Sequence, residues 1–192
     1  MTKLNLFSQI ISKLDRTCFK KIVSEKKTDK HQKGYSSWTH LVSMLFCQFA
    51  KSQSVRDISN GLRSATGNLN HLGIERAPSK STISYQNKNR DWTLFREYYY
   101  QLLSHLGQQV GFKQRKFRIK SKIFLLDSST ISLCLSLFDW AKYKTAKGAV
   151  KMHTLLDYDG NLPAYVNITD GKTADSKKPP LKTEALIFRL TP

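Results

Sequence analysis

The sequence has no long apolar run and few cysteines. No stretch approaches the roughly 18 apolar residues that a membrane-spanning helix needs, and no apolar core with a small-residue cleavage site marks a signal peptide. The three cysteines, Cys18, Cys47 and Cys134, lie far apart and form no CxxC pair. These absences argue against a membrane protein and a cysteine-based zinc site, and they favour reduced, buried thiols in a cytoplasmic protein.

Acidic residues are also scarce. The chain has 14 Asp and Glu against 32 Lys and Arg, which gives a formal net charge of +18 and a pI near 9.9. Because so much positive charge repels itself in a folded chain, a polyanionic partner is the natural expectation. DNA is favoured over RNA, since no strand combines the basic and aromatic residues that stack RNA bases.

Helical periodicity dominates the first 110 residues. Apolar residues recur at helical spacing in five segments, and the sequence predicts helices at about 4–23, 38–50, 54–62, 79–87 and 91–111. Ser36 or Ser37 is expected to cap the second helix, Ser54 to open the third with capping-box spacing to Asp57, and Asp91 to cap the last. Trp92 is expected to begin the apolar stripe of that last helix. Residues 20–33 and 67–78 are interpreted as connections.

The pattern changes to a period of two after residue 112. Alternating or apolar segments predict strands at about 116–127, 131–138, 149–157 and 162–168, the last two flanking an Asp-Gly turn. The expected fold class is therefore α+β, with a helical N-terminal domain over residues 1–110 followed by a mostly antiparallel sheet.

The two short helices between Ser54 and Asn89 resemble a helix-turn-helix reader of DNA, although their connection exceeds the usual 3–4 residues. The alternative interpretation is a polar surface helix of a bundle. In the first interpretation, polar side chains of the second helix contact phosphates and base edges. The candidate DNA-binding residues there are Lys80, Ser81, Thr82, Gln86, Asn87, Lys88 and Arg90.

A second basic element lies between Lys113 and Lys122. It holds six Lys and Arg and no acidic residue. Alternate residues of a strand point to the same side, so Lys116, Arg118, Lys120 and Lys122 can line one face along a duplex backbone. The alternative is an edge strand that its lysines keep soluble. The net charge favours DNA.

Asp127 is the candidate catalytic and metal-binding residue. It follows the apolar run at 123–126, and a carboxylate that emerges from a buried strand is unfavourable unless it is paired or binds a metal. Such a group can hold Mg²⁺ in phosphoryl transfer. The alternative is an Asp that caps a turn. His153 has no second ligand at metal spacing, and the GKT triplet at 171–173 is not a P-loop because Val166 replaces the first glycine.

Several segments around Asp127 resemble the DDE transposases of bacterial insertion sequences. These are residues 125–131 (LLDSSTI), 133–142 (LCLSLFDWAK), 147–157 (KGAVKMHTLLD) and 168–172 (ITDGK). Upstream, residues 38–41 (WTHL), 54–58 (SVRDI) and 89–92 (NRDW) resemble the N-terminal domain that often precedes this catalytic core. The resemblance runs from about residue 3 to residue 176.

The resemblance implies an RNase H-like core, incomplete here, whose first strands occupy residues 111–176. In that family three carboxylates hold two Mg²⁺ ions. The first matches Asp127, whereas the second, at the end of the fourth strand, and the third, a Glu on a later helix, have no counterpart. Residues 177–192 match no family pattern and are expected to result from a shifted reading frame.

The implied function is DNA transposition. The chain is expected to be a transposase fragment that binds transposon-end DNA, singly or as a homodimer, in the bacterial nucleoid, with no membrane partner and with no strand cleavage of its own. The alternative from another functional class is a non-catalytic DNA-binding protein, either a relic or a competitor for transposon ends.

Overall fold

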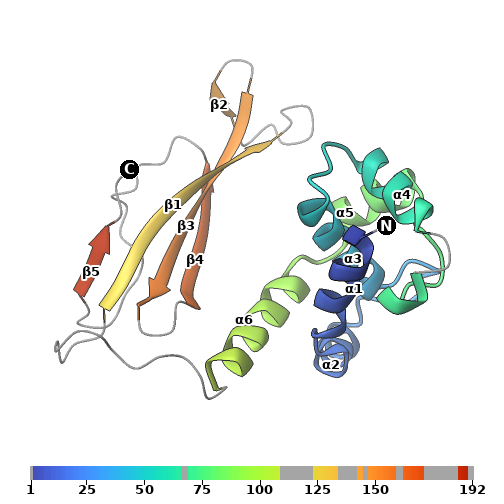
Figure 1. The fold of residues 1–192 in the computed structure, drawn as a ribbon, viewed down its shortest axis with the longest axis horizontal. Helices are drawn as coiled ribbons and strands as arrows, with labels where there is room; N and C mark the ends of the chain where they lie inside the picture. The colour runs from blue at the N-terminus through green and yellow to red at the C-terminus, as the bar shows by residue number, and fades with distance from the viewer. Residues whose placement is uncertain are drawn as a thin grey trace. The chain divides into compact units, whose positions relative to one another are not determined.

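The computed structural model describes residues 2–65, 69–108, 123–133, 142–144, 147–158, 162–170 and 186–189. They fall into two compact units, residues 1–102 and 103–192 (Figure 1). Helices form the first, here the helical unit, and the second contains a sheet. The fold class is therefore α+β with a helical N-terminal region, as the sequence predicts.

The predicted helix at 4–23 is in fact two helices, α1 (Thr2–Ser12) and α2 (Arg16–Lys26). Asp15 interrupts the helical backbone, because it adopts an extended conformation and its carboxylate accepts hydrogen bonds from the amides of Thr17 and Cys18, at 2.9 and 3.0 Å. A capping aspartate satisfies amides that have no partner within the helix. Because α2 extends to Lys26, the connection after it begins at Lys27 and not at Lys20.

The other predicted helices are confirmed, with boundaries that shift by a few residues. They are α3 (Ser37–Phe49), α4 (Val55–Ser64), α5 (Lys80–Asn89) and α6 (Thr93–Gln108), and the connection before α5 contains the short 3-10 helix η1 (Leu69–Leu72). Ser36 and Ser79 cap α3 and α5, and Ser54 forms the predicted capping box with Asp57. Local sequence signals therefore fix the ends of these helices.

A single hydrophobic core holds the helical unit together. It draws on every helix through Phe7, Ile11, Phe19, Ile22, Tyr35, Trp38, Val42, Ile58, Leu62, Leu72, Ile74, Ile83, Leu94 and Tyr98. Full burial of one such side chain contributes roughly 1.5–3 kcal/mol. Leu94 and Tyr98 confirm the apolar stripe of α6, but Trp92 is 64% exposed and does not belong to it. The stripe begins two residues later than predicted.

The described strands of the second unit form a five-stranded mixed sheet. Its strands are β1 (Ile123–Leu133), β2 (Lys142–Lys144), β3 (Lys147–Asp157), β4 (Leu162–Asp170) and β5 (Leu186–Arg189). The order is β2-β3-β1-β5, and β4 also pairs with β3 (Figure 1). β5 is parallel to β1, and the other pairs are antiparallel.

Three features of this sheet differ from the sequence prediction. β1 continues without a break through residues 128–133, so that no turn follows Asp127 and the two expected strands merge. The short strand β2 was not predicted, and neither was β5, which falls in the segment without family pattern. β3 and β4 confirm the strands at 149–157 and 162–168. The predicted strand residues 116–122 and 134–138 lie outside the described residues.

The cysteines and the helix lengths bear on the remaining expectations. Cys18 and Cys47 are free thiols that are half-buried, and burial raises the pKa of each, while Cys134 lies outside the described residues. Within the described part of the chain, no helix combines the length and the apolar character needed to cross a membrane.

Candidate nucleic-acid interface

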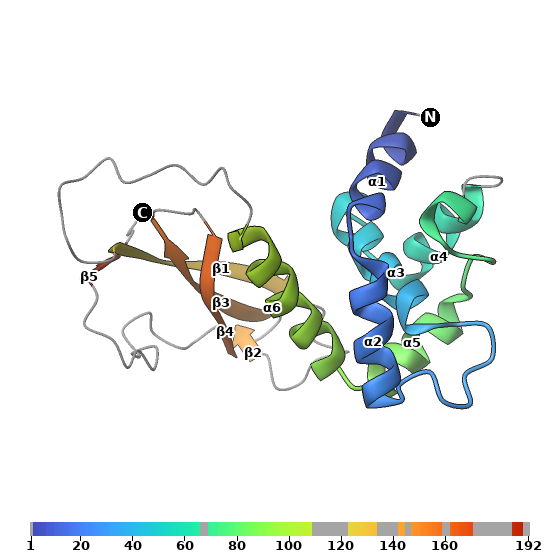
Figure 2. The ribbon, with the colours of Figure 1, turned by 90° about the horizontal axis from the view of Figure 1, so that it is seen from below.

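Helices α4 and α5 pack against each other in the helical unit (Figures 1 and 2). Their apolar sides contribute Ile58, Leu62 and Ile83 to the core. The buried hydroxyl of Ser59 on α4 donates a 2.8 Å hydrogen bond to the carbonyl oxygen of Pro78, just before α5. The two helices are therefore fixed as a pair, although their connection is far longer than that of an ordinary helix-turn-helix motif.

The outer side of α5 presents a row of exposed side chains, which we name the α5 stripe. It consists of Ser81, Ser84, Tyr85 and Lys88, all exposed and spaced i, i+3, i+4 and i+7 along the helix. This spacing places them on one face. Tyr85 is 65% exposed, which is unusual for so large an aromatic side chain. The stripe thus offers hydroxyl groups, an aromatic ring and a cation to the solvent.

The start of α5 carries the remaining predicted contacts. Lys80 is exposed there. The amide of Thr82 donates to the hydroxyl of Ser79 at 3.1 Å, and the two hydroxyl groups lie 2.8 Å apart. Thr82 therefore takes part in the helix cap. The exposed Ser81 hydroxyl also lies 2.9 Å from that of Ser79, and Lys80 is the exposed charged group of this turn.

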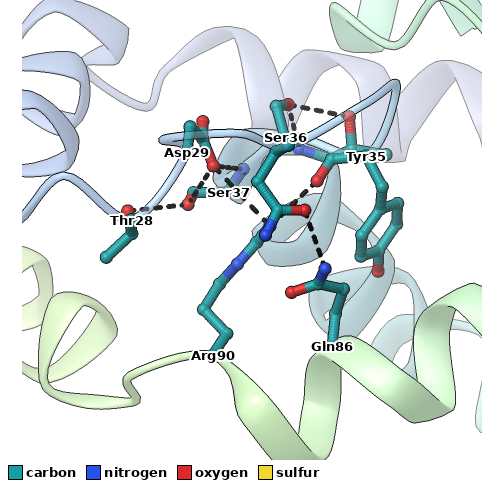
Figure 3. Close-up of polar contacts among 9 residues, drawn as sticks. Thr28, Asp29, Tyr35, Ser36, Ser37, Gln86 and Arg90 are labelled. Atoms are coloured by element: carbon teal, nitrogen blue, oxygen red, sulfur yellow. Dashed lines mark hydrogen bonds and ion pairs between the residues drawn. The ribbon is translucent and has the colours of Figure 1, made fainter.

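Gln86 and Arg90 point into the helical unit instead (Figure 3). The Gln86 amide nitrogen donates to the side-chain oxygen of Gln32 at 2.7 Å. The Arg90 side chain is 1% exposed; its Nη2 donates to the Tyr35 carbonyl oxygen at 2.9 Å and lies 3.6 Å from Oδ1 of Asp29. The sequence suggested that both side chains reach DNA, but burial removes them from the exposed face.

The partners of Arg90 form a polar network at the start of α3 (Figure 3). Asp29 accepts hydrogen bonds from the amide and the hydroxyl of Ser37, at 2.8 and 2.7 Å, and the Ser37 hydroxyl also lies 3.0 Å from that of Thr28. The Asp29 carboxylate thus accepts a hydrogen bond from an amide at the start of α3 and provides the opposite charge for Arg90. Contacts between residues so far apart in the sequence carry no local signal, which explains why sequence reasoning missed them.

His40 on α3 connects this network to α5. Its Nε2 lies 3.3 Å from Oδ1 of Asn87, a residue predicted to bind DNA, which is exposed. Burial, and secondarily the charge of Arg90, lower the pKa of His40 to about 4. The imidazole is therefore neutral at neutral pH. Asn87 is exposed, but its side-chain oxygen contacts the buried ring of His40. This contact fixes the position of the Asn87 side chain beside the α5 stripe.

Asp127 lies in the middle of β1 and not at its end. It pairs with Thr154 of β3, which pairs in turn with Val166 of β4. Directly paired residues of antiparallel strands share a face of the sheet. Asp127, Thr154 and Val166 therefore lie on one face, together with Leu125 and Ser129 of β1. This carboxylate has apolar and hydroxyl neighbours on that face.

The other acidic residues of the described strands are not beside Asp127. Asp157 pairs with Phe124, which the alternation of β1 places on the opposite face. Asp170 pairs with Val150, itself paired with Ile131, so it lies four residues away along the strands, or about 13 Å. No cluster of three His, Cys, Asp or Glu occurs among the residues that the structure describes.

His153 occupies the face opposite to Asp127. It pairs with Ser128, and its Nε2 lies 3.0 Å from the hydroxyl oxygen of Thr169. The sequence shows no second metal ligand at a suitable spacing from this histidine. The basic side chains predicted to line a duplex, Lys116, Arg118, Lys120 and Lys122, lie outside the described residues.

The comparisons with known proteins bear on the N-terminal part of the chain. A family model described as a domain of unknown function, DUF4372, matches residues 2–75. No curated protein and no solved structure matches the chain. The matched region covers α1 to α4 and η1, and it ends before α5. The chain therefore carries a DUF4372 domain at its N-terminus.

Proposed function

We propose that this chain is a DNA-binding protein of DNA transposition, and that it holds duplex DNA through the α5 stripe. The observation that carries this proposal is the stripe itself. It lies on a Ser-capped helix that is braced by α4 and by buried contacts, and it belongs to a chain of net charge +18. A capped polar helix on a second helix is the arrangement with which many proteins enter a major groove.

The exposed groups suit distinct parts of a duplex. Lys80 and Lys88 provide cations for phosphates. Ser81, Ser84 and Asn87 provide small hydrogen-bonding groups for phosphate oxygens or base edges. In this proposal Gln86 and Arg90 contact no DNA; they are positioning residues that hold the end of α5.

The sequence resemblance to DDE transposases supports the link to transposition. Asp127 would be the first metal-binding carboxylate of such a core. Its described neighbours do not fit a two-metal site, since the nearest acidic residues of the described strands lie on the other face or two strands away and about 13 Å further along them. The second and third carboxylates that the resemblance implies have no counterpart in the sequence. Because each hard cation takes about six oxygen ligands, one carboxylate is insufficient.

The proposal therefore assigns DNA binding to this chain and no strand cleavage. Binding at transposon ends without cleavage would make it a competitor of an active transposase. The basic residues Lys116, Arg118, Lys120 and Lys122 would add phosphate contacts to those of the helical unit.

Salt dependence of binding tests the proposal. We would measure fluorescence anisotropy of a labelled duplex over a range of salt concentrations, for the whole chain and for a variant with Lys116, Arg118, Lys120 and Lys122 replaced by Ala. Each phosphate contact contributes about −0.9 to the slope of log K against log salt. The variant is expected to show a flatter slope and weaker binding to all sequences alike.

A variant of equal charge provides the control. Replacement of four exposed lysines of the helical unit, Lys13, Lys20, Lys21 and Lys30, removes the same charge elsewhere. A slope that flattens equally in both variants would show that only net charge matters. A slope that stays unchanged in the first variant would assign its basic residues to solubility.

A further inference from the structure

The two described tryptophans each have an arginine over the ring, but in opposite environments. Trp38 is 7% exposed; its indole N–H donates to the Leu72 carbonyl oxygen at 2.9 Å, and the guanidinium of Arg16 lies 4.7 Å from the ring centroid. Trp92 is 64% exposed, with the guanidinium of Arg96 4.9 Å from its ring. Trp38 therefore belongs to the hydrophobic core, whereas Trp92 is exposed to solvent.

Among the described residues, Trp92 belongs neither to the buried core nor to the apolar side chains packed against it. Leu94 and Tyr98 lie on the side of α6 that packs into the core. Trp92 and Arg96, which are four residues apart, lie on the opposite, exposed side. A tryptophan exposed to this extent leaves a large apolar surface in water. The arginine lies over one side of the ring, so a flat aromatic surface and a cation are presented to the solvent together.

Two carboxylates, Asp91 and Glu97, lie near the exposed arginine of this pair. Asp91 accepts hydrogen bonds from the amide and the hydroxyl of Thr93, and Glu97 forms a 3.0 Å ion pair with Lys26. Glu97 is thus paired with Lys26, whereas Asp91 stays charged and also interacts electrostatically with Arg96, whose guanidinium remains exposed to solvent. A stacking surface with a cation next to it suits a nucleotide, because the base stacks on the indole while the guanidinium contacts its phosphate.

The position of Trp92 connects it to the α5 stripe. It follows the last residue of α5, Asn89, by three residues, so its backbone lies within about 11 Å of the end of that helix. We propose that the Trp92–Arg96 pair stacks an unpaired base of single-stranded DNA that continues from a duplex held by α5. This inference rests on the proposed function. A second copy of this chain is a poorer occupant, since each copy carries +18.

Two DNA probes test the inference. One is a blunt duplex, and the other is the same duplex with a five-nucleotide single-stranded thymidine overhang, each titrated with the whole chain. Wild-type protein is expected to bind the overhang probe about ten-fold more tightly, which is the effect of about one stacked base. Trp92→Ala should remove this preference, Trp92→Phe should keep part of it, and Arg96→Gln should reduce it.

Tyr100→Ala is the matched control. Tyr100 is an exposed aromatic residue (40%) on the same helix, and its replacement should leave the preference for the overhang intact. A second readout uses tryptophan emission, which a ten-nucleotide thymidine strand should quench in the wild type and not in Trp92→Phe.

The outcomes separate this inference from the proposed function. Equal binding of both probes by the wild type overturns the inference alone, as does an equal loss of affinity for both probes in Trp92→Ala. Weaker self-association of Trp92→Ala in sedimentation, with the overhang preference retained, would identify a second copy as the partner and also overturn it. If the blunt duplex is not bound at all, the proposed function fails, and quenching by the thymidine strand still decides the role of Trp92.

Discussion

The two sides of α5 use similar side chains for opposite purposes. Lys88 is exposed on the α5 stripe, whereas Arg90, two residues later, is buried against Asp29 and the Tyr35 carbonyl. Likewise Asn87 is exposed, whereas Gln86, its neighbour, is buried against Gln32. The comparison teaches that residue type does not identify a DNA contact in this helix. What identifies one is the direction of the side chain relative to the core.

The largest expected effect is on the buried side. Replacement of Arg90 by Ala leaves Asp29 without its cation and opens a void next to Tyr35, so we expect a loss of about 3 kcal/mol in the free energy of unfolding. The Nε and Nη1 of Arg90 have no hydrogen-bond partner among the described residues. Because methionine fills the same space without these groups, Arg90→Met should recover about half of the loss. Urea denaturation measures both.

Arg96→Ala serves as the control for Arg90. This arginine is exposed on α6, and its removal should change stability by no more than about 0.5 kcal/mol. Equal losses for the two variants would mean that the buried network contributes nothing particular to the helical unit.

The second expected effect is a pH dependence of stability, which arises from the buried His40. The pKa of His40 is about 4 in the folded chain and ordinarily 6.5, mainly because the ring is buried. The unfolded chain therefore takes up a proton below pH 6.5 that the folded chain does not. Stability that is present above pH 6.5 is lost as the pH falls towards 4, by about 2 kcal/mol between pH 7 and pH 5.

His40→Gln tests this assignment. Glutamine can still donate to Asn87 but does not titrate, so the decrease in stability between pH 7 and pH 5 should be about 2 kcal/mol smaller than in the wild type. Thermal denaturation at the two pH values gives the difference. The same pH dependence in both proteins would place the titrating group elsewhere.

The third effect concerns the exposed side. Replacing Lys80 and Lys88 by Ala should reduce the magnitude of the salt slope by up to about 1.8, because two phosphate contacts are lost. Stability should stay within about 0.5 kcal/mol of the wild type. Lys20 and Lys21 on α2, replaced in the same way, are the charge-matched control. A flatter slope in the control alone would move the interface to α2.

Last, we expect the replacement of Asp127 to have no effect on DNA cleavage. With Mg²⁺ or Mn²⁺, the purified chain should not nick a labelled transposon-end duplex, and Asp127→Ala should behave like the wild type, because no other carboxylate of the described strands lies beside Asp127. Metal-dependent nicking that disappears in the variant would show that further ligands complete a site around Asp127.

Local signals in the sequence predicted much of the fold. Ser36, Ser54 and Asp91 sit where helices begin, and each acts on amides within three residues, so the pattern is legible without tertiary structure. Asp15 shows the same chemistry but was overlooked, because the apolar periodicity continues through it. A capping residue such as Asp15 within a segment of continuous helical periodicity therefore indicates two helices instead of one.

Non-local contacts set the limit of prediction for the candidate site. The burial of Gln86 and Arg90 depends on partners more than 50 residues earlier, which periodicity cannot reveal. The place of Asp127 was predicted on a buried strand, but its mid-strand position depends on pairing with β3 through residue 133. The pairing of β5 with β1 likewise depends on distant residues.

The long-range support of α5 has a consequence for dissecting the protein. The family match ends at residue 75, yet Ile83, Leu94 and Tyr98 complete the core that the matched residues begin. A fragment cut at residue 75 would expose that core, and a fragment of α4 and α5 alone would lose Asp29, Gln32, Tyr35 and His40. Closing a loop of some 55 residues requires most of the unit to fold first. The smallest autonomous folding piece therefore extends at least from α1 into α6.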